Sequence, residues 1–333
     1  MASHIDILMN SLDHTTRKNK NNLGISLLQL HNLVISSPEF HQTLISKGII
    51  NKLAATMKNT LNNPKNIRYS VLILMSLIDQ TPTPNHTPTP NHTPTHIKDL
   101  LIFSGILDIT SNKLKEYHTH PDTIVALCSL LEKLIYSQEL CEYVGNLGIQ
   151  QTLMRYVMSY RNYHRMFHLF CNIIRDLSNH INISDPDILS CILYIMDCNQ
   201  YPPSITIHGC SAIWSIMRYP NNRCIMNELG VKTILTNMNI HANDQSAQLM
   251  SIMALLNIAR NNPDNQRTIN DLNGIQSITT AMVSFPSNPQ LISMSLIALY
   301  EIVLNNKTNL DTLSKSNGEQ LIKQAMVDHP RLM

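Results

Sequence analysis

The chain has 333 residues, of which 43% are hydrophobic and 14% are charged, whereas typical domains carry about 25% charged residues. Its 25 Lys and Arg nearly balance its 23 Asp and Glu, so there is no bulk field to attract polyanions or acidic membranes. Nucleic acid is therefore not expected as the main ligand. Since no uninterrupted apolar run approaches about 18 residues, no membrane insertion is expected either.

The seven cysteines mostly lie in apolar helical stretches and never form a CxxC pair. This pattern favours buried, reduced thiols over a disulfide framework or a zinc ribbon. The first twenty residues lack the basic-then-apolar order of a signal peptide. The expected location is the cytosol, with the nucleus as the alternative.

Glycine corners recur along the chain, each between an apolar stretch and a new amphipathic run, at Gly48, Gly105, Gly148, Gly230, Gly274 and Gly318. Their separations are 57, 43, 82, 44 and 44 residues. The 57-residue interval contains the tract TPTPNHTPTPNHTPTH, and the 82-residue interval is two periods, with a run beginning at Pro186 in place of a glycine. Repeats of this length predict an α-solenoid.

The spacing of the glycine corners divides the chain into an expected cap, a repeat region and a tail. Residues 1–20 are expected to form an N-terminal helix or cap, residues 21–328 the repeats and residues 329–333 a tail. The Thr/Pro/Asn/His tract at 81–96 reads as a loop insertion, because its prolines exclude a helix. Its Thr-Pro pairs or histidines could serve modification or docking, but an expansion without a role is the favoured interpretation.

One repeat shows the expected unit. Residues 245–262 form a long helix that is apolar on most sides, and a short helix follows Pro263. Gly274 then opens a third helix, at a corner that needs a positive φ or a close backbone approach. Proline independently marks the start of several long helices, at Asn63-Pro64, His120-Pro121, Pro202-Pro203 and Asn288-Pro289.

The corner motif G-[IV]-x-x-[IL] and the long-helix endings LHNLVIS (30–36) and LLNIARNN (255–262) resemble those of armadillo repeats. The resemblance covers about residues 21–328. It implies an all-α fold, a right-handed α-α superhelix of about seven three-helix repeats. The long helices would line a concave groove.

Armadillo proteins that bind extended peptides commonly carry an Asn near the end of each long helix and a Trp one turn earlier. Asn32 and Asn257 match the Asn position, but Leu28 and Met253 hold the corresponding Trp sites, and Trp214 lies beside the Asn position. A nuclear-import type of groove is therefore disfavoured. The residues predicted to bind a partner are Asn32, Lys133, Asp176, Trp214, Ser215, Asn257 and Glu301; Ser76 occupies the same place in a further repeat.

Alternatives stay open for these side chains. Asn32 and Asn257 could clamp a peptide backbone, or could bond their own helical turn, which is the favoured interpretation. Trp214 is more readily a core residue than a groove anchor, and Arg218 one turn later could stack on it. His164 and His168 share a helical face, with Cys171 a turn further on. They are the best metal candidates, but neither a metal nor a cofactor is expected.

Enzyme signatures such as a phosphate loop, HExxH or Gly-x-Ser-x-Gly are absent from the sequence. The prediction is a non-catalytic scaffold or adaptor without a small-molecule substrate, which binds one or more proteins or extended peptides along the concave groove. The alternatives are a structural subunit of a cytoskeletal or ciliary assembly, which the low charge favours, and a nuclear transport adaptor.

Overall fold

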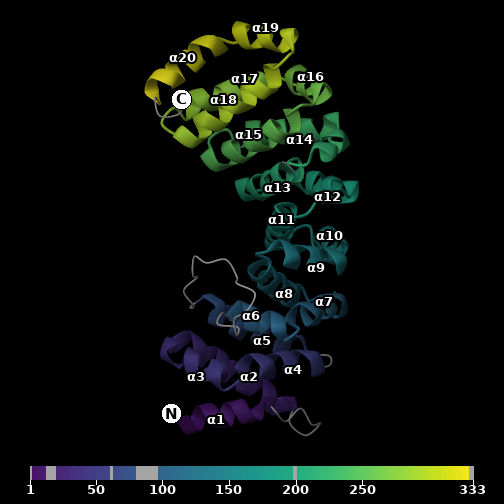
Figure 1. Cartoon of the computed structure of the whole chain (residues 1–333), viewed down its shortest axis with the longest axis vertical. Helices are drawn as coiled ribbons and strands as arrows, with labels where there is room; N and C mark the ends of the chain where they lie inside the picture. Colours follow the sequence, from purple (N-terminus) through teal and green to yellow (C-terminus); the bar gives the residue numbers. More distant parts are fainter. Residues whose placement is uncertain (1, 13–19, 61–62, 80–96, 198–200, 330–333) are drawn as a thin grey trace. The chain divides into compact units, whose positions relative to one another are not determined.

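The computed structural model describes residues 2–12, 20–60, 63–79, 97–197 and 201–329 (Figure 1). These residues form helices and their connections, without a β-strand in the described ranges. Among the described helices, none combines the length and the apolar character needed to cross a membrane. The tract at 81–96 and the tail beyond residue 329 lie outside the described residues. The chain divides into two compact units, residues 1–152 and 153–333.

Unit 1 is built around three long helices, α2 (Lys20–Ser36), α5 (Pro64–Asp79) and α8 (Pro121–Leu134), which pack in chain order. The shorter helices between them are η2 (Pro38–Phe40), α3 (His41–Ser46), α4 (Ile49–Asn59), α6 (Ile97–Phe103), α7 (Ile106–Glu116) and α9 (Gln138–Asn146). The N-terminal helix α1 (Ala2–Ser11) packs on α2. Helix α10 (Ile149–Ser159) spans the boundary between the units.

Unit 2 repeats the arrangement with α11 (His164–Ser178), α13 (Pro203–Ile216), α15 (Gln245–Ala259) and α18 (Pro289–Val303) as consecutive long helices. Between and after them come α12 (Pro186–Met196), η3 (Pro220–Ile225), α14 (Glu228–Ile240), α16 (Pro263–Asp271), α17 (Gly274–Ser284), α19 (Lys307–Lys315) and α20 (Gly318–Asp328). Each long helix packs against the next, which confirms the predicted all-α solenoid. The assignment of one continuous repeat domain over 21–328 stays a prediction.

Two repeats of unit 2 differ from the predicted three-helix unit. Between α11 and α12 the chain makes a turn and an extended stretch over residues 179–185, with no short helix in that described segment. The stretch is short, and Pro186 disfavours helical conformation in the residue before it. After α13 the short element is the 3₁₀ helix η3 rather than an α-helix.

Both conditions predicted to favour glycine at the corners, a positive φ and a close backbone approach, occur in the structure. Gly48, Gly105 and Gly148 adopt positive φ values of 76°, 73° and 67°. At the later corner the positive φ belongs to Asn273, at 63°, and Gly274 is the first helical residue. A Cβ on Gly274 would lie 2.7 Å from the carbonyl oxygen of Ile269. The corner predicted at Gly230 instead begins at Asn227, whose side chain accepts from the Gly230 N–H.

The predicted proline starts are confirmed for four long helices, which begin at Pro64, Pro121, Pro203 and Pro289. A proline at this position loses no helical hydrogen bond, because the first N–H groups of a helix have no intrahelical acceptor. Beside it, Asn288 accepts hydrogen bonds from the N–H groups of Gln290 and Leu291. The proline and the capping side chain together fix where the long helix begins.

Three buried asparagines on the short helices of unit 2 connect neighbouring repeats; we call them the asparagine ladder. They are Asn222, Asn265 and Asn309, with exposed fractions of 1%, 6% and 1%. Each donates through Nδ2 to a carbonyl oxygen at the end of its own long helix: Ile216 at 2.9 Å, Ile258 at 3.0 Å and Ile302 at 2.8 Å.

The second hydrogen of each ladder amide reaches the preceding repeat. The acceptors are the carbonyl oxygens of Ile183 at 3.0 Å, Arg223 at 2.9 Å and Gln266 at 3.0 Å. The last carbonyls of a helix lack intrahelical partners, and burying a polar group without a hydrogen bond is costly. The ladder therefore satisfies the long-helix ends and couples each repeat to the one before it.

Replacement of Asn265 by Ala should lower the unfolding free energy by about 2–3 kcal/mol, because two buried carbonyl oxygens lose their donor. Urea unfolding followed by circular dichroism measures the change. The control Gln276→Ala, at an exposed position of α17, should change stability by less than about 0.5 kcal/mol. Equal effects of the two substitutions would show that the ladder does not stabilise unit 2.

Candidate partner-binding surface

The ends of consecutive long helices lie side by side in unit 2, and they carry most of the predicted partner-binding residues. Asp176 lies near the end of α11, Trp214 and Ser215 near the end of α13, Asn257 in α15 and Glu301 in α18. Since these helices pack in order, the residues form one row, which we call the helix-end surface.

The other two predicted residues belong to unit 1. Asn32 is exposed on α2. Lys133, on α8, forms an ion pair with Asp79 at the end of α5. This ion pair links two neighbouring long helices. Ser76 also lies on α5.

Asn257 has a structural contact that neither of its two sequence interpretations included. Its Nδ2 donates to the carbonyl oxygen of Trp214, 43 residues earlier, at 2.7 Å, and the residue is buried. The amide therefore bonds neither a free groove nor its own turn. It joins α15 to the end of α13.

Trp214 is half-buried. It is therefore neither a fully buried core residue nor a fully exposed groove residue, the two roles considered from the sequence. The cation–π contacts among the described residues are Lys98 with Tyr136 and Lys113 with Tyr117, so the proposed stack of Arg218 on Trp214 is not formed. The Arg218 guanidinium donates to Asn179 Oδ1 at 2.9 Å. The buried Ser215 hydroxyl donates to the same oxygen at 3.5 Å.

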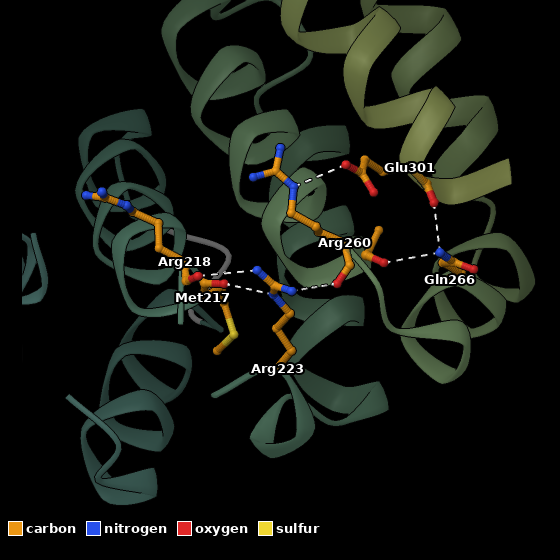
Figure 2. A network of polar contacts seen from close by, with 7 residues as sticks. Met217, Arg218, Arg223, Arg260, Gln266 and Glu301 are labelled. Carbon is orange, nitrogen blue, oxygen red and sulfur yellow. Dashed lines mark hydrogen bonds and ion pairs between the residues drawn. The ribbon is translucent and has the colours of Figure 1, made fainter. Parts of the chain in front are cut away.

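Figure 2 shows a network of polar contacts that connects α13, α15 and α18 at their ends. Arg223 donates through Nε to the Met217 carbonyl at 3.1 Å, through Nη1 to the Arg260 carbonyl at 2.9 Å and through Nη2 to the Arg218 carbonyl at 3.3 Å. Arg260 in turn pairs with Glu301, with 3.1 Å between Nε and Oε1. The network therefore spans three consecutive repeats.

Gln266 completes the network on the α18 side. Its Nε2 donates to the carbonyl oxygens of Ala259, at 3.3 Å, and Glu301, at 2.9 Å. Glu301 thus takes part through both its carboxylate and its backbone (Figure 2). The Arg260 guanidinium of the preceding repeat therefore fixes the orientation of the Glu301 side chain.

Arg223 is 6% exposed and lies where two helices end. The carbonyl ends of α13 and α15 carry partial negative charge, which favours a cation there. Burial lowers the pKa of Arg223, and the nearby Arg260 lowers it further, whereas Glu301 raises it. A guanidinium remains protonated in proteins despite such shifts. Arg223 is therefore a charged cap for two helix ends, and the sequence analysis did not single it out.

The histidines of α11 do not assemble the metal site that the sequence made possible. His168 stacks on His208 of α13, with ring centroids 4.3 Å apart, and His164 packs edge-on against Tyr201. Cys171 is buried, and the pKa of its thiol is raised by burial. Across the residues that the structure describes, no group of three or more His, Cys, Asp or Glu could hold a metal ion.

The histidine pair lies in a half-buried environment. Burial, followed by the nearby His208 and His164, lowers the pKa of His168 to about 4. The pKa of His208 is also lowered, by burial and by Arg175, and its Nδ1 lies 3.0 Å from Asn172 Oδ1. Both imidazoles are therefore neutral at physiological pH.

A groove of about 680 Å³ lies between α10 and α12 in unit 2. Its lining includes Met158, Tyr194 and Cys191, with Arg155 and Asp187 as its charged members. Burial raises the pKa of Cys191 to about 12, so the thiol stays protonated and is not a nucleophile at neutral pH. These lining groups include no carboxylate pair or histidine for acid–base chemistry.

No family model matches the chain, and no curated protein sequence matches it. Among solved structures, the chain is similar to one described as "A conserved phosphorylation switch controls the interaction between cadherin and beta-catenin in vitro and in vivo", with a TM-score of 0.77 and 14% identity. That similarity covers 94% of this chain and 55% of the other, so the chain spans about half the length of that relative.

Two engineered proteins are also similar. One has a TM-score of 0.73 and 12% identity over 95% of this chain and 72% of its own. The other has a TM-score of 0.59 and 12% identity over 76% of this chain and 96% of its own. At such low identity, these likenesses show the helical repeat fold alone.

Replacement of Arg223 by Met should lower the unfolding free energy by about 2–3 kcal/mol, because the buried carbonyls at two helix ends lose a charged donor. Arg223→Lys should recover part of this, since an ammonium keeps the charge but not the forked geometry. Denaturant unfolding measures both variants. Arg267→Met, which removes an exposed ion pair with Asp264, is the control and should cost less than about 1 kcal/mol.

The stability of unit 2 should fall as the pH drops from about 6.5 towards about 4. The folded-state pKa of His168 lies below its ordinary value of 6.5, so the unfolded chain binds the proton more readily and acid favours unfolding. His168→Gln should flatten this pH dependence, whereas His180→Gln, at an exposed position, should retain it. Urea midpoints measured at several pH values test the expectation, and an unchanged slope in His168→Gln would contradict it.

Proposed function

We propose that the chain is a non-catalytic scaffold that binds extended segments of partner proteins along the helix-end surface of unit 2. The observation that carries the proposal is the set of contacts between the ends of successive long helices. Asn257 joins α15 to α13, and Arg260 joins α15 to Glu301 of α18. A surface made of repeated, mutually fixed helix ends suits a long, narrow ligand, because each repeat can contact a successive part of it.

The side chains along this surface suggest how a segment is held. Trp214 is half-buried, so part of its ring can pack on an apolar side chain while the rest anchors in the unit. Tryptophan in this setting is a frequent source of binding energy. Charges of both signs flank it: Asp176 and Arg175 form a pair on α11, and Arg218 is exposed beyond α13.

Internal bonding narrows the choice of contact residues. The Asn257 amide and the Ser215 hydroxyl already bond neighbouring helices, so we assign them to holding the surface in shape. Trp214 and Asp176 are the residues we propose to meet the partner, whereas the Glu301 carboxylate is bonded to Arg260 and is also assigned to holding the surface in shape. In unit 1 we propose Asn32 for the same part, whereas Lys133 is bonded to Asp79 of the neighbouring long helix.

The structural likeness supports this proposal at the level of architecture. The similar structure with a TM-score of 0.77 is described as one of an interaction between cadherin and β-catenin, and the helical repeat is the fold that it shares with this chain. We propose that the helical repeat of this chain likewise binds a protein partner. The proposed location of the chain is the cytosol or the nucleus.

Selection of a displayed library of proteome-derived peptides on the purified protein should enrich segments that depend on the helix-end surface. Trp214→Ala and Asp176→Lys should each weaken the best peptide by about tenfold or more, because they remove an aromatic anchor and reverse a charge. Fluorescence anisotropy measures the affinity, and circular dichroism checks that helical content is unchanged.

Tyr194→Ala provides the control, since Tyr194 is an exposed aromatic on α12, outside the helix-end surface. It should leave peptide affinity unchanged. Peptides that lose affinity with Tyr194→Ala but not with Trp214→Ala or Asp176→Lys would move the binding site to the groove beside α12.

A further inference from the structure

The last repeat of unit 2 presents a surface that the preceding repeat buries. Figure 1 shows α18, α19 and α20 at the end of unit 2. An offset of 44 residues relates this repeat to α15, α16 and α17, as the pairs Asn273/Asn317 and Gly274/Gly318 show. We call the corresponding uncovered side the end face; its residues are Tyr300, Leu310, Glu319, Lys323 and Met326.

Burial at equivalent positions defines the end face. Leu256, Gln266 and Met282 are 5%, 4% and 3% exposed. Their equivalents Tyr300, Leu310 and Met326 are 60%, 48% and 40% exposed. In the inner repeat, α18 packs against α15, α16 and α17, and within the described residues no later long helix does the same for α18, α19 and α20. Three large apolar side chains of the last repeat are therefore exposed where their equivalents are buried.

The end face is not built to receive another repeat of the same kind. Gln266 reaches forward to the carbonyl of Glu301 and is replaced at the equivalent position by the apolar Leu310. The buried Ile275 and Thr279 of α17 are replaced by the exposed Glu319 and Lys323 of α20. A following repeat would have to bury these two charges in the manner of Ile275 and Thr279, which is unfavourable without partners.

The two charges on the end face can be partners for their own copies. Glu319 and Lys323 lie four residues apart and therefore on one side of α20. Their side chains form no ion pair with each other or with another described residue; the Ser314 hydroxyl donates to Glu319 at 3.0 Å. When two such helices meet antiparallel about a two-fold axis that passes between Glu319 and Lys323, each Glu faces the Lys of the other copy. The charge pattern is self-complementary.

We infer that the end face docks a second copy of this chain, forming a two-fold symmetric dimer. Two-fold interfaces use the same patch on both subunits, and this patch combines the apolar Tyr300, Leu310 and Met326 with a reciprocal charge pair. The apolar residues supply the buried area, and the pairing of Glu319 with Lys323 of the second copy sets the register.

This inference does not depend on the proposed peptide binding. The dimer uses the end face of the last repeat, whereas the proposed peptide contacts begin at Asp176 and Trp214 in earlier repeats. A failure of peptide selection would leave the dimer untouched, and a monomeric protein would leave the peptide proposal untouched.

The test is a charge-reversal pair measured on the full chain by analytical ultracentrifugation and native mass spectrometry. The wild type should dimerise reversibly. Glu319→Lys places two Lys on each end face and Lys323→Glu places two Glu there, so each variant alone should dimerise about tenfold more weakly or worse. An equal mixture should form the heterodimer at least as readily as the wild type forms its dimer, because every reciprocal contact then joins Lys to Glu.

Matched control variants add the same charges to the outer side of α17, as Gln276→Lys and Thr280→Glu, both at exposed positions. They should leave the dimer unchanged. Leu310→Asp should weaken the dimer independently of the charge pair. A wild type that stays monomeric at high micromolar concentration would overturn the inference, and so would a dimer that is indifferent to the α20 variants or a mixture that forms no heterodimer.

Discussion

The structure of unit 2 depends on how the carbonyl ends of its long helices are satisfied. A helix leaves its last carbonyl groups without intrahelical donors, and close packing of successive helices keeps water from several of them. The ladder residues Asn222, Asn265 and Asn309 resolve this with one amide each, which bonds its own helix end and the preceding repeat. Arg223 and Gln266 act on the same ends. Each long-helix end is thereby tied to the repeat before it, through acceptors that lie 39, 42 and 43 residues earlier in the sequence.

The sequence was sufficient to predict the fold because the backbone requirements are visible in it. Corners with positive φ favour Gly or Asn, and helix starts favour Pro, so Gly48 and Pro289 mark geometry directly. The asparagine ladder was missed for a physical reason. Asn265 and Asn309 lie in polar short helices, where composition suggests exposure rather than burial. The available signal was their constant place, seven residues after Ile258 and Ile302.

The candidate site was predicted less completely, since helical spacing places a residue on a face but does not reveal its partner. Lys133 and Glu301 were expected as groove charges, yet each is paired, with Asp79 and with Arg260. These partners lie 54 and 41 residues away in sequence, across a repeat boundary. Asn257 shows the same limitation, because the carbonyl it bonds belongs to the preceding long helix. The sequence did predict that these residues lie near the ends of long helices, as the helix bounds show; their role in binding stays a prediction.

The ladder position is filled differently after the first long helix of unit 1. In unit 1 the equivalent place after α2 is held by His41, whose Nε2 lies 2.7 Å from the carbonyl oxygen of Val34, seven residues earlier. A ring nitrogen can donate only one hydrogen, whereas an amide NH₂ donates two. His41 therefore ties its short helix to its own long helix, while Asn265 and Asn309 also hold the neighbouring repeat. In unit 2 this second bond ties a long-helix end to the short element of the preceding repeat, and a ligand that contacts several repeats needs neighbouring repeats held at a fixed spacing. For this reason we place the helix-end surface in unit 2.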